Sequence, residues 1–499
     1  MGPRLRNPML GLGLLGLVAA SAGCRIDQQD IETWKGTVKG PGKMVAVVLA
    51  PKYEMELRSA AALALVDMER SDVDGVAELQ QALARLDAKT RAALIDGLAP
   101  GLIALMQGDG EPPKPGEPPP ARQIRAKDSA FALIPEAAPE TRQALTEAVV
   151  RWYTVDFAGR NLSGAYSAEQ VMRGLGSEAA KLLVDALHAR LPQRALVKLA
   201  ELIGQLGDAQ TKKRAADKLV KIEQEMRSAE FLEWLKGQIR DQFEASGEKP
   251  DDERVLKAAI LNQAKFIDEG AIPAMKHLAS EPQVADRLLA IAARKEAVLA
   301  ARRTRALQAL EGNAREEHLD TLLSLALDPE APASVRDYAF DRVGDVRSKR
   351  AIEPMWPLVA DADNQRLRWR AGELVLQIGG NAVLSEFFAK LPGGRETAYE
   401  PEELEGYASR MGQMTPPPTE VAAAQLASPD WFDRVIALNY FQRKGDEDDV
   451  PRMRRLLSDT APVTGKGWDD DETVGKVAKQ AIAGLRERLG HGKADAAGG

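Results

Sequence analysis

The feature that most constrains this chain is an internal repeat in its C-terminal half. A basic residue is followed three positions later by alanine, and four positions after that by a larger apolar residue. The four clearest instances are Arg303/Ala306/Leu310, Arg336/Ala339/Val343, Arg368/Ala371/Val375 and Arg434/Ala437/Phe441. Their arginines are separated by 33, 32 and 66 residues, and the last step is close to two periods. A period of this length is typical of proteins that stack one helical pair on the next.

The spacing within each trio predicts a helix with one buried face. Offsets of three and four residues bring side chains to the same side of a helix. Alanine there lets a neighbouring helix approach, and the bulkier residue fills the space beside it. Aromatic residues make up only 5% of the 499 residues, whereas strong helix formers are abundant. Because a helical chain of this length exceeds one core, we predict an all-α protein folded as an α-α superhelix.

The repeat resembles a known family in the stretch "LDPEAPASVRDYAFDRVG", residues 327–344. An aspartate, a Val-Arg pair, an alanine and a glycine turn in this order resemble HEAT repeats, particularly the short type first noted in phycobilisome lyases. The resemblance is good over residues 300–485 and looser over 54–300, and other α-α solenoids share such degenerate signals. It implies that the trio residues are structural: Arg303, Ala306, Arg336, Ala339, Arg368, Ala371, Arg434 and Ala437.

Interruptions of the helical pattern suggest how the chain is organised. Prolines at 112, 113, 115, 118, 119 and 120 forbid a helix there. We expect a signal peptide (1–23), a polar tether (24–42), N-terminal helical repeats (43–107), a proline-rich loop or linker (108–122), divergent helical repeats (123–300), HEAT-like repeats (301–488) and a disordered tail (489–499). We expect a further insertion at Thr464–Thr473, between the last two apolar helices.

The N-terminus has the three parts of a secretory signal: a basic start, a short apolar run and small residues. The run is shorter than the roughly 20 residues needed to span a bilayer. The only cysteine, Cys24, ends the sequence "SAGC", which resembles the lipobox of bacterial lipoproteins. That resemblance implies cleavage before Cys24 and its attachment to lipid. Arg25 then favours the outer membrane over retention at the inner one, so we expect a lipid-anchored protein of the bacterial cell envelope that faces the periplasm.

Composition argues against several classes of function. The formal charge is −7, and it becomes −9 once a leader with two arginines and no acid is removed. Mild acidity argues against nucleic-acid binding. The four histidines (His188, His277, His318 and His491) are widely separated, and no nucleophile or phosphate-binding motif is found. We therefore expect no enzyme activity, catalytic residue, cofactor, metal site or small-molecule substrate.

Two kinds of charged segment leave alternatives open. The acidic runs 445–451 and 468–473 could bind calcium, or they could cap the following helices through Asp449 and Asp471. The basic clusters 301–305, 366–370 and 452–455 could bind an anionic polysaccharide or lipid, or they could pair with acids of adjacent repeats.

A solenoid offers extended surface rather than a catalytic pocket. The expected function is a scaffold or adaptor that binds a protein partner in the cell envelope. The alternatives are a module that binds envelope polysaccharide or lipid through its basic helices, and a lyase-like enzyme accessory.

Overall fold

The computed structural model describes residues 26–68, 73–108, 120–156, 165–296, 299–393 and 398–490. Predictions for the signal peptide and Cys24, and for nearly all of the tail, lie outside these ranges. The described chain is helical and contains no β-strand, only an isolated bridge between Pro462 and Thr473. The predicted fold class, an all-α chain of the α-α superhelical type, is confirmed.

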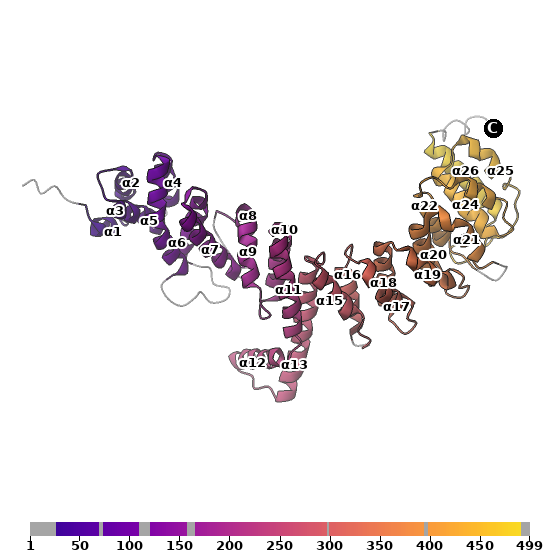
Figure 1. The fold of residues 1–499 in the computed structure, drawn as a ribbon, viewed down its shortest axis with the longest axis horizontal. Coiled ribbons are helices and arrows are strands. Elements are labelled where there is room, and N and C mark those ends of the chain that lie inside the picture. Colours follow the sequence, from indigo (N-terminus) through magenta and orange to yellow (C-terminus); the bar gives the residue numbers. More distant parts are fainter. Residues whose placement is uncertain are drawn as a thin grey trace, which may run out of the picture. The chain divides into compact units, whose positions relative to one another are not determined.

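The chain divides into two compact units, Met1–Leu183 and Val184–Gly499, and each is described by itself. The first unit contains η1 (Ile134–Glu136) and the helices α1 (Gln28–Trp34), α2 (Gly40–Leu49), α3 (Met55–Asp67), α4 (Gly75–Ala84), α5 (Ala88–Gln107), α6 (Ala121–Leu133), α7 (Pro139–Asp156), α8 (Ala168–Leu175) and α9 (Ser177–Ala186), the last of which crosses into the second unit (Figure 1).

The second unit contains the repeats on which the sequence analysis rests. Its helices are α10 (Gln193–Leu206), α11 (Ala209–Glu225), α12 (Ala229–Ala245), α13 (Asp252–Lys265), α14 (Ile272–Lys276), α15 (Pro282–Ala292), α16 (Ala300–Ala309), α17 (Leu319–Leu327), α18 (Ala333–Val346), α19 (Ile352–Val359), α20 (Gln365–Gly379), α21 (Leu384–Lys390), α22 (Pro401–Met411), α23 (Thr419–Gln425), α24 (Trp431–Lys444), α25 (Val450–Arg454) and α26 (Val474–Arg488). Shorter turns are the π-helix η2 (Phe266–Ala271), η4 (Glu316–His318), η5 (Lys349–Ala351), η6 (Gly380–Val383) and η7 (Glu447–Asp449).

The structure differs from two of the expected boundaries. The proline-rich segment does not separate compact units, because α5 and α6, which precede and follow it, pack against each other. Part of the expected tether is helical: α1 packs on α3 through the buried side chain of Ile31. Asp27 and Asp30 form a capping box at the start of α1, and Lys35 pairs with Asp67 at 2.8 Å.

One layer of the second unit consists of α16, α18, α20, α22, α24 and α26, each of which contacts the next. We call this the even layer. Ala306, Ala339, Ala371 and Ala437 lie in it, and their side chains are fully buried. The 66-residue step is explained by α22, which lies between α20 and α24. Its buried Glu403 follows Arg368 by 35 residues and precedes Arg434 by 31, so this repeat carries an acid instead of a base.

Two arginines of the repeating trio bind the ends of preceding helices. Nε of Arg303 donates to the carbonyl of Ala292, the last residue of α15, at 2.8 Å. In the first unit, Nε of Arg58 donates in the same way to Val48 near the end of α2. A cation there satisfies carbonyls left free at a helix end and complements the helix dipole. Arg434 differs, because its Nη1 donates at 3.0 Å to the carbonyl of Pro429, in the turn that precedes α24. Arg336 differs as well, because its Nε has no hydrogen-bond partner among the described residues.

The insertion at 464–473 packs onto the chain before α22. The indole Nε1 of Trp468 donates to the carbonyl of Tyr399 at 2.8 Å, and the amide of Tyr399 donates to the carbonyl of Thr464 at 3.1 Å. The helix cap expected at Asp471 is instead made by Thr473, which accepts from the amide of Lys476. Asp471 forms an ion pair with the Lys476 side chain.

Candidate functional site

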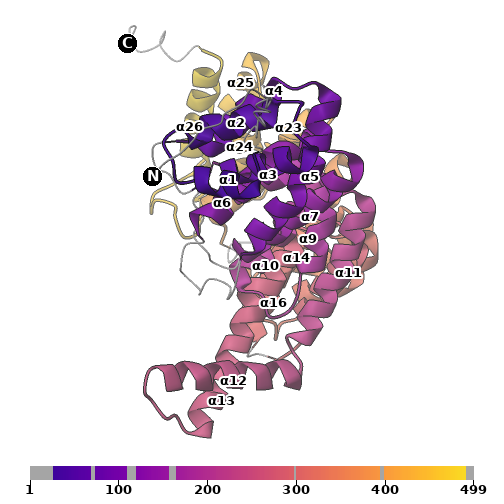
Figure 2. The ribbon, with the colours of Figure 1, turned by 90° about the vertical axis from the view of Figure 1, so that its left-hand side faces the viewer.

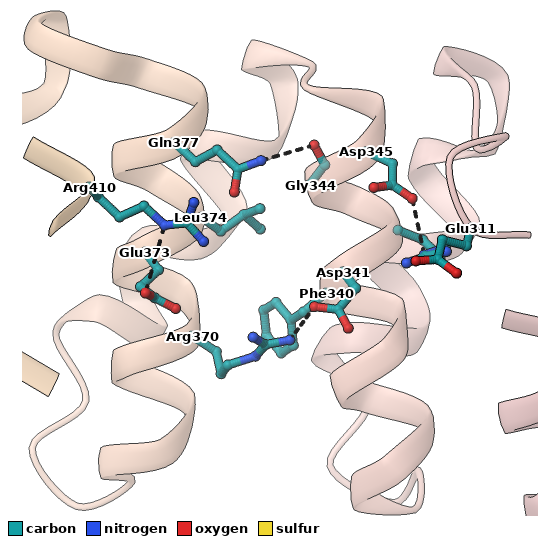
Figure 3. A pocket seen from close by; sticks show the side chains of 11 residues that line it. Glu311, Phe340, Asp341, Gly344, Asp345, Arg370, Glu373, Leu374, Gln377 and Arg410 are labelled. Atoms are coloured by element: carbon teal, nitrogen blue, oxygen red, sulfur yellow. Dashed lines mark hydrogen bonds and ion pairs between the residues drawn. The ribbon is translucent and has the colours of Figure 1, made fainter. Parts of the chain in front are cut away.

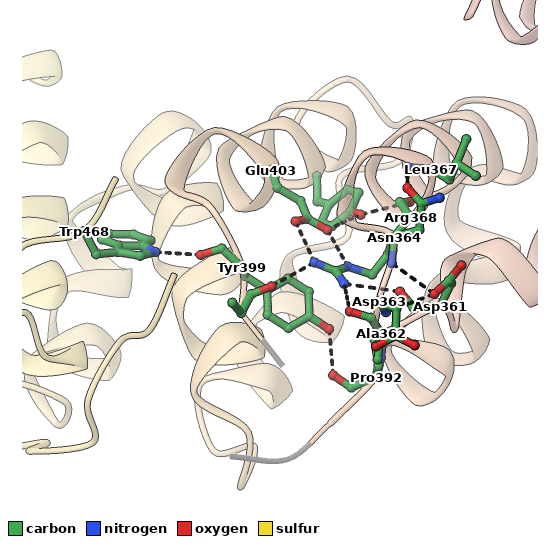
Figure 4. Close-up of polar contacts among 12 residues, drawn as sticks. Asp361, Ala362, Asp363, Asn364, Leu367, Arg368, Pro392, Tyr399, Glu403 and Trp468 are labelled. Carbon is green, nitrogen blue, oxygen red and sulfur yellow. Dashed lines mark hydrogen bonds and ion pairs between the residues drawn. The ribbon is translucent and has the colours of Figure 1, made fainter. Parts of the chain in front are cut away.

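A buried ion pair joins α20 to α22 within the even layer. Arg368 and Glu403 are both 0% exposed, with Nε to Oε1 at 2.8 Å and Nη2 to Oε2 at 3.0 Å (Figure 4). The remaining donors of Arg368 reach the carbonyls of Asp361 and Ala362, each at 3.2 Å. The carbonyl of Ala398 lies 2.9 Å from Nη2. A charge taken this far from water requires such complete pairing, so this arginine holds three segments together.

Two tyrosine side chains pack around this ion pair. The guanidinium of Arg368 lies 4.4 Å from the ring centre of Tyr399, and the hydroxyl of Tyr407 lies 2.9 Å from Oε1 of Glu403. Burial raises the pKa of both Tyr399 and Tyr407 well above the ordinary value, so both hydroxyls stay protonated. The two helices also approach closely, because a Cβ on Gly372 would lie 2.6 Å from the Tyr407 ring. This cluster is a structural core rather than a reactive centre.

A ladder of ion pairs runs across the even layer, and each rung joins one helix to the next. The rungs are Asp341–Arg370 between α18 and α20, Glu373–Arg410 at 3.7 Å between α20 and α22, and Glu405–Arg443 at 3.1 Å between α22 and α24. At the end of the ladder, Arg488 of α26 donates to the carbonyls of Gln442 and Gly445. In every rung the later helix supplies the cation, which fits a repeating unit.

The ladder borders two hollows. The first, of about 300 Å³, lies among α18, α20 and α22 and is lined by the first two rungs together with Leu374 and Gln377 (Figure 3). The amide of Gln377 reaches the carbonyl of Gly344 only at 3.5 Å. At the limit of hydrogen-bond geometry, this contact leaves the Gln377 amide weakly held.

The second hollow, of about 560 Å³, lies among α22, α24 and α26. Its lining includes the polar side chains of Ser409, Gln413, Asn439, Gln442 and Lys444. Asn439 is only 8% exposed, yet its amide forms no hydrogen bond with any other described residue. Each carboxamide offers both donors and an acceptor. The second hollow therefore presents side-chain amides of the kind that a peptide group matches.

These amides were missed from the sequence because they carry no charge and belong to no motif. One signal was present: Gln377, Gln413 and Gln442 are separated by 36 and 29 residues, which is close to the repeat period.

The arginines of the basic clusters are largely engaged with acids of neighbouring helices. Arg302 pairs with Asp268 at 2.6 Å, and Arg366 pairs with Asp337. Arg452 lies 3.7 Å from Glu420. Arg454 and Arg455 are exposed. The geometry of the first two clusters matches the structural interpretation rather than a free basic trough.

The acidic runs act locally. Asp446 and Asp449 form a capping box at η7, so the cap before α25 begins at Asp446 rather than Asp449. Within the described ranges, no group of three His, Cys, Asp or Glu side chains could hold a metal ion. His318 lies 2.9 Å from Asp286, with no nucleophile in this contact, and burial lowers the pKa of His188 and His277.

No protein-family model matches the chain, and no curated protein matches it in sequence. Among solved structures, Kap121p bound to Nup53p is similar at 14% identity and a TM-score of 0.36, covering 94% of this chain and 46% of that one. The karyopherin Kap121p bound to the SUMO protease Ulp1p gives 12% and 0.35, with the same coverage. The chain thus spans less than half the length of Kap121p. Over the part of the chain that the structure describes, no helix is long and apolar enough to cross a membrane.

Proposed function

We propose that the chain is a non-catalytic, lipid-anchored scaffold or adaptor of the bacterial cell envelope, and that it binds a protein partner along the even layer from α18 to α26. The observation that carries the proposal is the second hollow, in which the side-chain amides of Asn439, Gln442 and Gln413 lie together and make no hydrogen bond with another described residue. Donors and acceptors gathered in one hollow support a binding surface.

The partner segment is extended and polar. Main-chain amides and carbonyls of such a segment would pair with the carboxamides of Asn439, Gln442 and Gln413, which line one hollow. The neighbouring rung, Glu405–Arg443, is about half exposed on both sides (54% and 45%). An exposed pair of this kind is weak in water, so its charges are available to side chains of the partner.

The location is proposed from the sequence. The signal-like N-terminus, the lone Cys24 after "SAG" and Arg25 support a lipid anchor in the outer membrane that leaves the solenoid in the periplasm. Two or three acyl chains anchor a protein firmly, since each buried methylene contributes about 0.8 kcal/mol. A Cys24→Ala variant should leave the membrane fraction, and its retention there would contradict the anchor without bearing on the even layer.

The binding proposal is tested by crosslinking in intact cells that produce the full chain, followed by purification of the adducts. Asn439→Ala combined with Gln442→Ala should remove one specific adduct, because the partner then loses amide contacts in the second hollow. The matched control is Gln224→Ala, an exposed amide on α11 outside the even layer. If the adduct persists in the double variant at the wild-type level, the even layer is not the binding surface.

A further inference from the structure

The two hollows that border the ladder differ in charge. The first is lined by three arginines, and each of them is paired with a carboxylate of the same lining (Figure 3). Glu311 adds a fourth acid, so carboxylates outnumber cations there. The second hollow is lined by a single carboxylate, Glu405, and by three cations, which are Arg443, Lys444 and Arg488. Because the whole chain carries a charge of −7, its composition does not explain this local excess of cations.

Two of the three cations in the second hollow have no carboxylate partner. Glu405 is already paired with Arg443. The side chain of Arg488 donates only to two main-chain carbonyls at the end of α24. Lys444 is exposed and forms no ion pair or hydrogen bond with another described residue. The acids that follow α24, at 446–449, form the capped turn η7 and pair with neither cation.

These two cations lie at the same end of the second hollow. Lys444 is the last residue of α24, and Arg488 binds the carbonyl of the residue after it, Gly445. The aliphatic part of Lys444 packs on the end of α22, where a Cβ on Gly412 would lie 3.2 Å from its Cγ and Cε. Packing and hydrogen bonds therefore hold both positive charges in place.

The amides of the second hollow complement these charges. Asn439, Gln442 and Gln413 offer donors and acceptors to peptide groups. Gln442 lies against α26, where a Cβ on Gly484 would lie 2.5 Å from its Nε2. Cations bind carboxylates through charge-assisted hydrogen bonds, which are about twice as strong as neutral ones. A ligand that carries both peptide groups and carboxylates matches this lining.

We propose that the partner segment is acidic, and that it places a side-chain carboxylate between Lys444 and Arg488 in the second hollow. This inference rests on the proposed function, since it specifies the chemistry of the protein that the even layer binds. The cations of the first hollow are already paired and do not compete for the carboxylate. The acidic part of the segment therefore lies over α22, α24 and α26 rather than over α18.

The test is fluorescence anisotropy with the purified full chain in mild detergent. The probes are three short rhodamine-labelled peptides in which serine alternates with glutamate, with glutamine or with lysine. The glutamate peptide should bind at least about tenfold more tightly than the glutamine peptide, because only the former makes charge-assisted contacts. Lys444→Gln should weaken binding of the glutamate peptide by about tenfold for the same reason.

The matched control is Lys257→Gln, which removes the same charge far from the even layer. Lys257 is exposed and unpaired on α13, in the hairpin formed by α12 and α13. Figures 1 and 2 both show this hairpin projecting from the second unit. The control should bind the glutamate peptide as the wild type does, and an equal loss in the two variants would contradict the proposal.

The outcomes separate this inference from the proposed function. Equal binding of the three peptides, abolished by Asn439→Ala with Gln442→Ala, would leave the binding surface in place and refute its preference for acids. Glutamate-peptide binding that is unchanged in Lys444→Gln would also refute the inference. Failure of all three peptides to bind would do so too, while the crosslinking test still decides the proposed function. If phosphatidylglycerol vesicles bind through Lys444 and the glutamate peptide does not, the cations serve lipid and the inference is wrong.

Discussion

The second unit uses arginine–carboxylate pairs at two depths, and the contrast shows which of them hold the fold. Arg368–Glu403 is fully buried and bidentate, and the arginine also donates to three main-chain carbonyls. Glu405–Arg443, on the even layer, joins the next two helices by one contact in water. Removing one member of a buried pair leaves a bare charge in a low dielectric, whereas a surface pair exchanges readily with water. The first pair is therefore structural, and the second contributes little to the fold.

The largest effect is expected from breaking the buried pair. Glu403→Ala should lower the free energy of unfolding by about 3–5 kcal/mol, since Arg368 is left uncompensated. Replacing both members, by Arg368→Met with Glu403→Leu, should recover most of this loss. Urea unfolding of the three proteins gives the comparison, and a single variant as stable as the wild type would show that the pair does not hold α20 to α22.

The buried carboxyl of Asp433 allows the effect of burial to be measured through the pH dependence of stability. Burial raises the pKa of Asp433 from 3.8 to about 7, although Ser428 donates a hydrogen bond to it at 2.8 Å. Between about pH 4 and pH 7 the unfolded chain loses this proton while the folded chain keeps it, so this group makes stability fall as pH rises.

Asp433→Asn should therefore match the wild type near pH 4 and exceed its free energy of unfolding at pH 8 by about 2–4 kcal/mol. Urea unfolding at several pH values measures this difference, and parallel stability curves for the two proteins would be the contrary result.

Disturbing the close approach of Gly372 to the Tyr407 ring should destabilise the fold somewhat less than breaking the buried pair. Gly372→Ala places a Cβ 2.6 Å from the Tyr407 ring, and overpacking of this kind destabilises by about 1–3 kcal/mol. Gly237→Ala in α12 is the matched control, because nothing lies within 4 Å of its Cβ. It should stabilise by up to about 1 kcal/mol. Thermal unfolding distinguishes the two, and equal shifts would argue against close packing at α20.

The smallest effect on stability is expected at the exposed ion pair Glu405–Arg443. Arg443→Ala should change the free energy of unfolding by less than about 1 kcal/mol, while it reduces the yield of the even-layer crosslink. A large loss of stability would place this pair with the buried one and remove the distinction between them.

The sequence allowed the repeating layer to be predicted because helix packing leaves a periodic trace. Ala306, Ala339, Ala371 and Ala437 recur at a helical spacing, and all are fully buried. The partners of the arginines were predicted only in part. One of the two interpretations of the basic clusters paired them with acids of adjacent repeats, but Arg303 binds the carbonyl of Ala292. A main-chain acceptor has no signature in the sequence.

Other features could not be predicted because they depend on tertiary packing. The prolines between α5 and α6 show where the helix stops but not that the two helices then pack together. α1 is short and mostly polar, and it is held on α3 by the buried side chain of Ile31 and by the Lys35–Asp67 ion pair. Asn439 is distinguished by what surrounds it, since nothing in its neighbours along the chain marks its amide as unsatisfied.

The π-helix η2 has a mechanical consequence. It carries α13 directly into α14 with no intervening loop, and Asp268 within it is tied to Arg302 of α16. The α12–α13 hairpin is thus rigidly connected to the repeats. To tilt it, the π-helix would have to rewind or Asp268 would have to separate from Arg302, so a movement of the hairpin would also move the repeats.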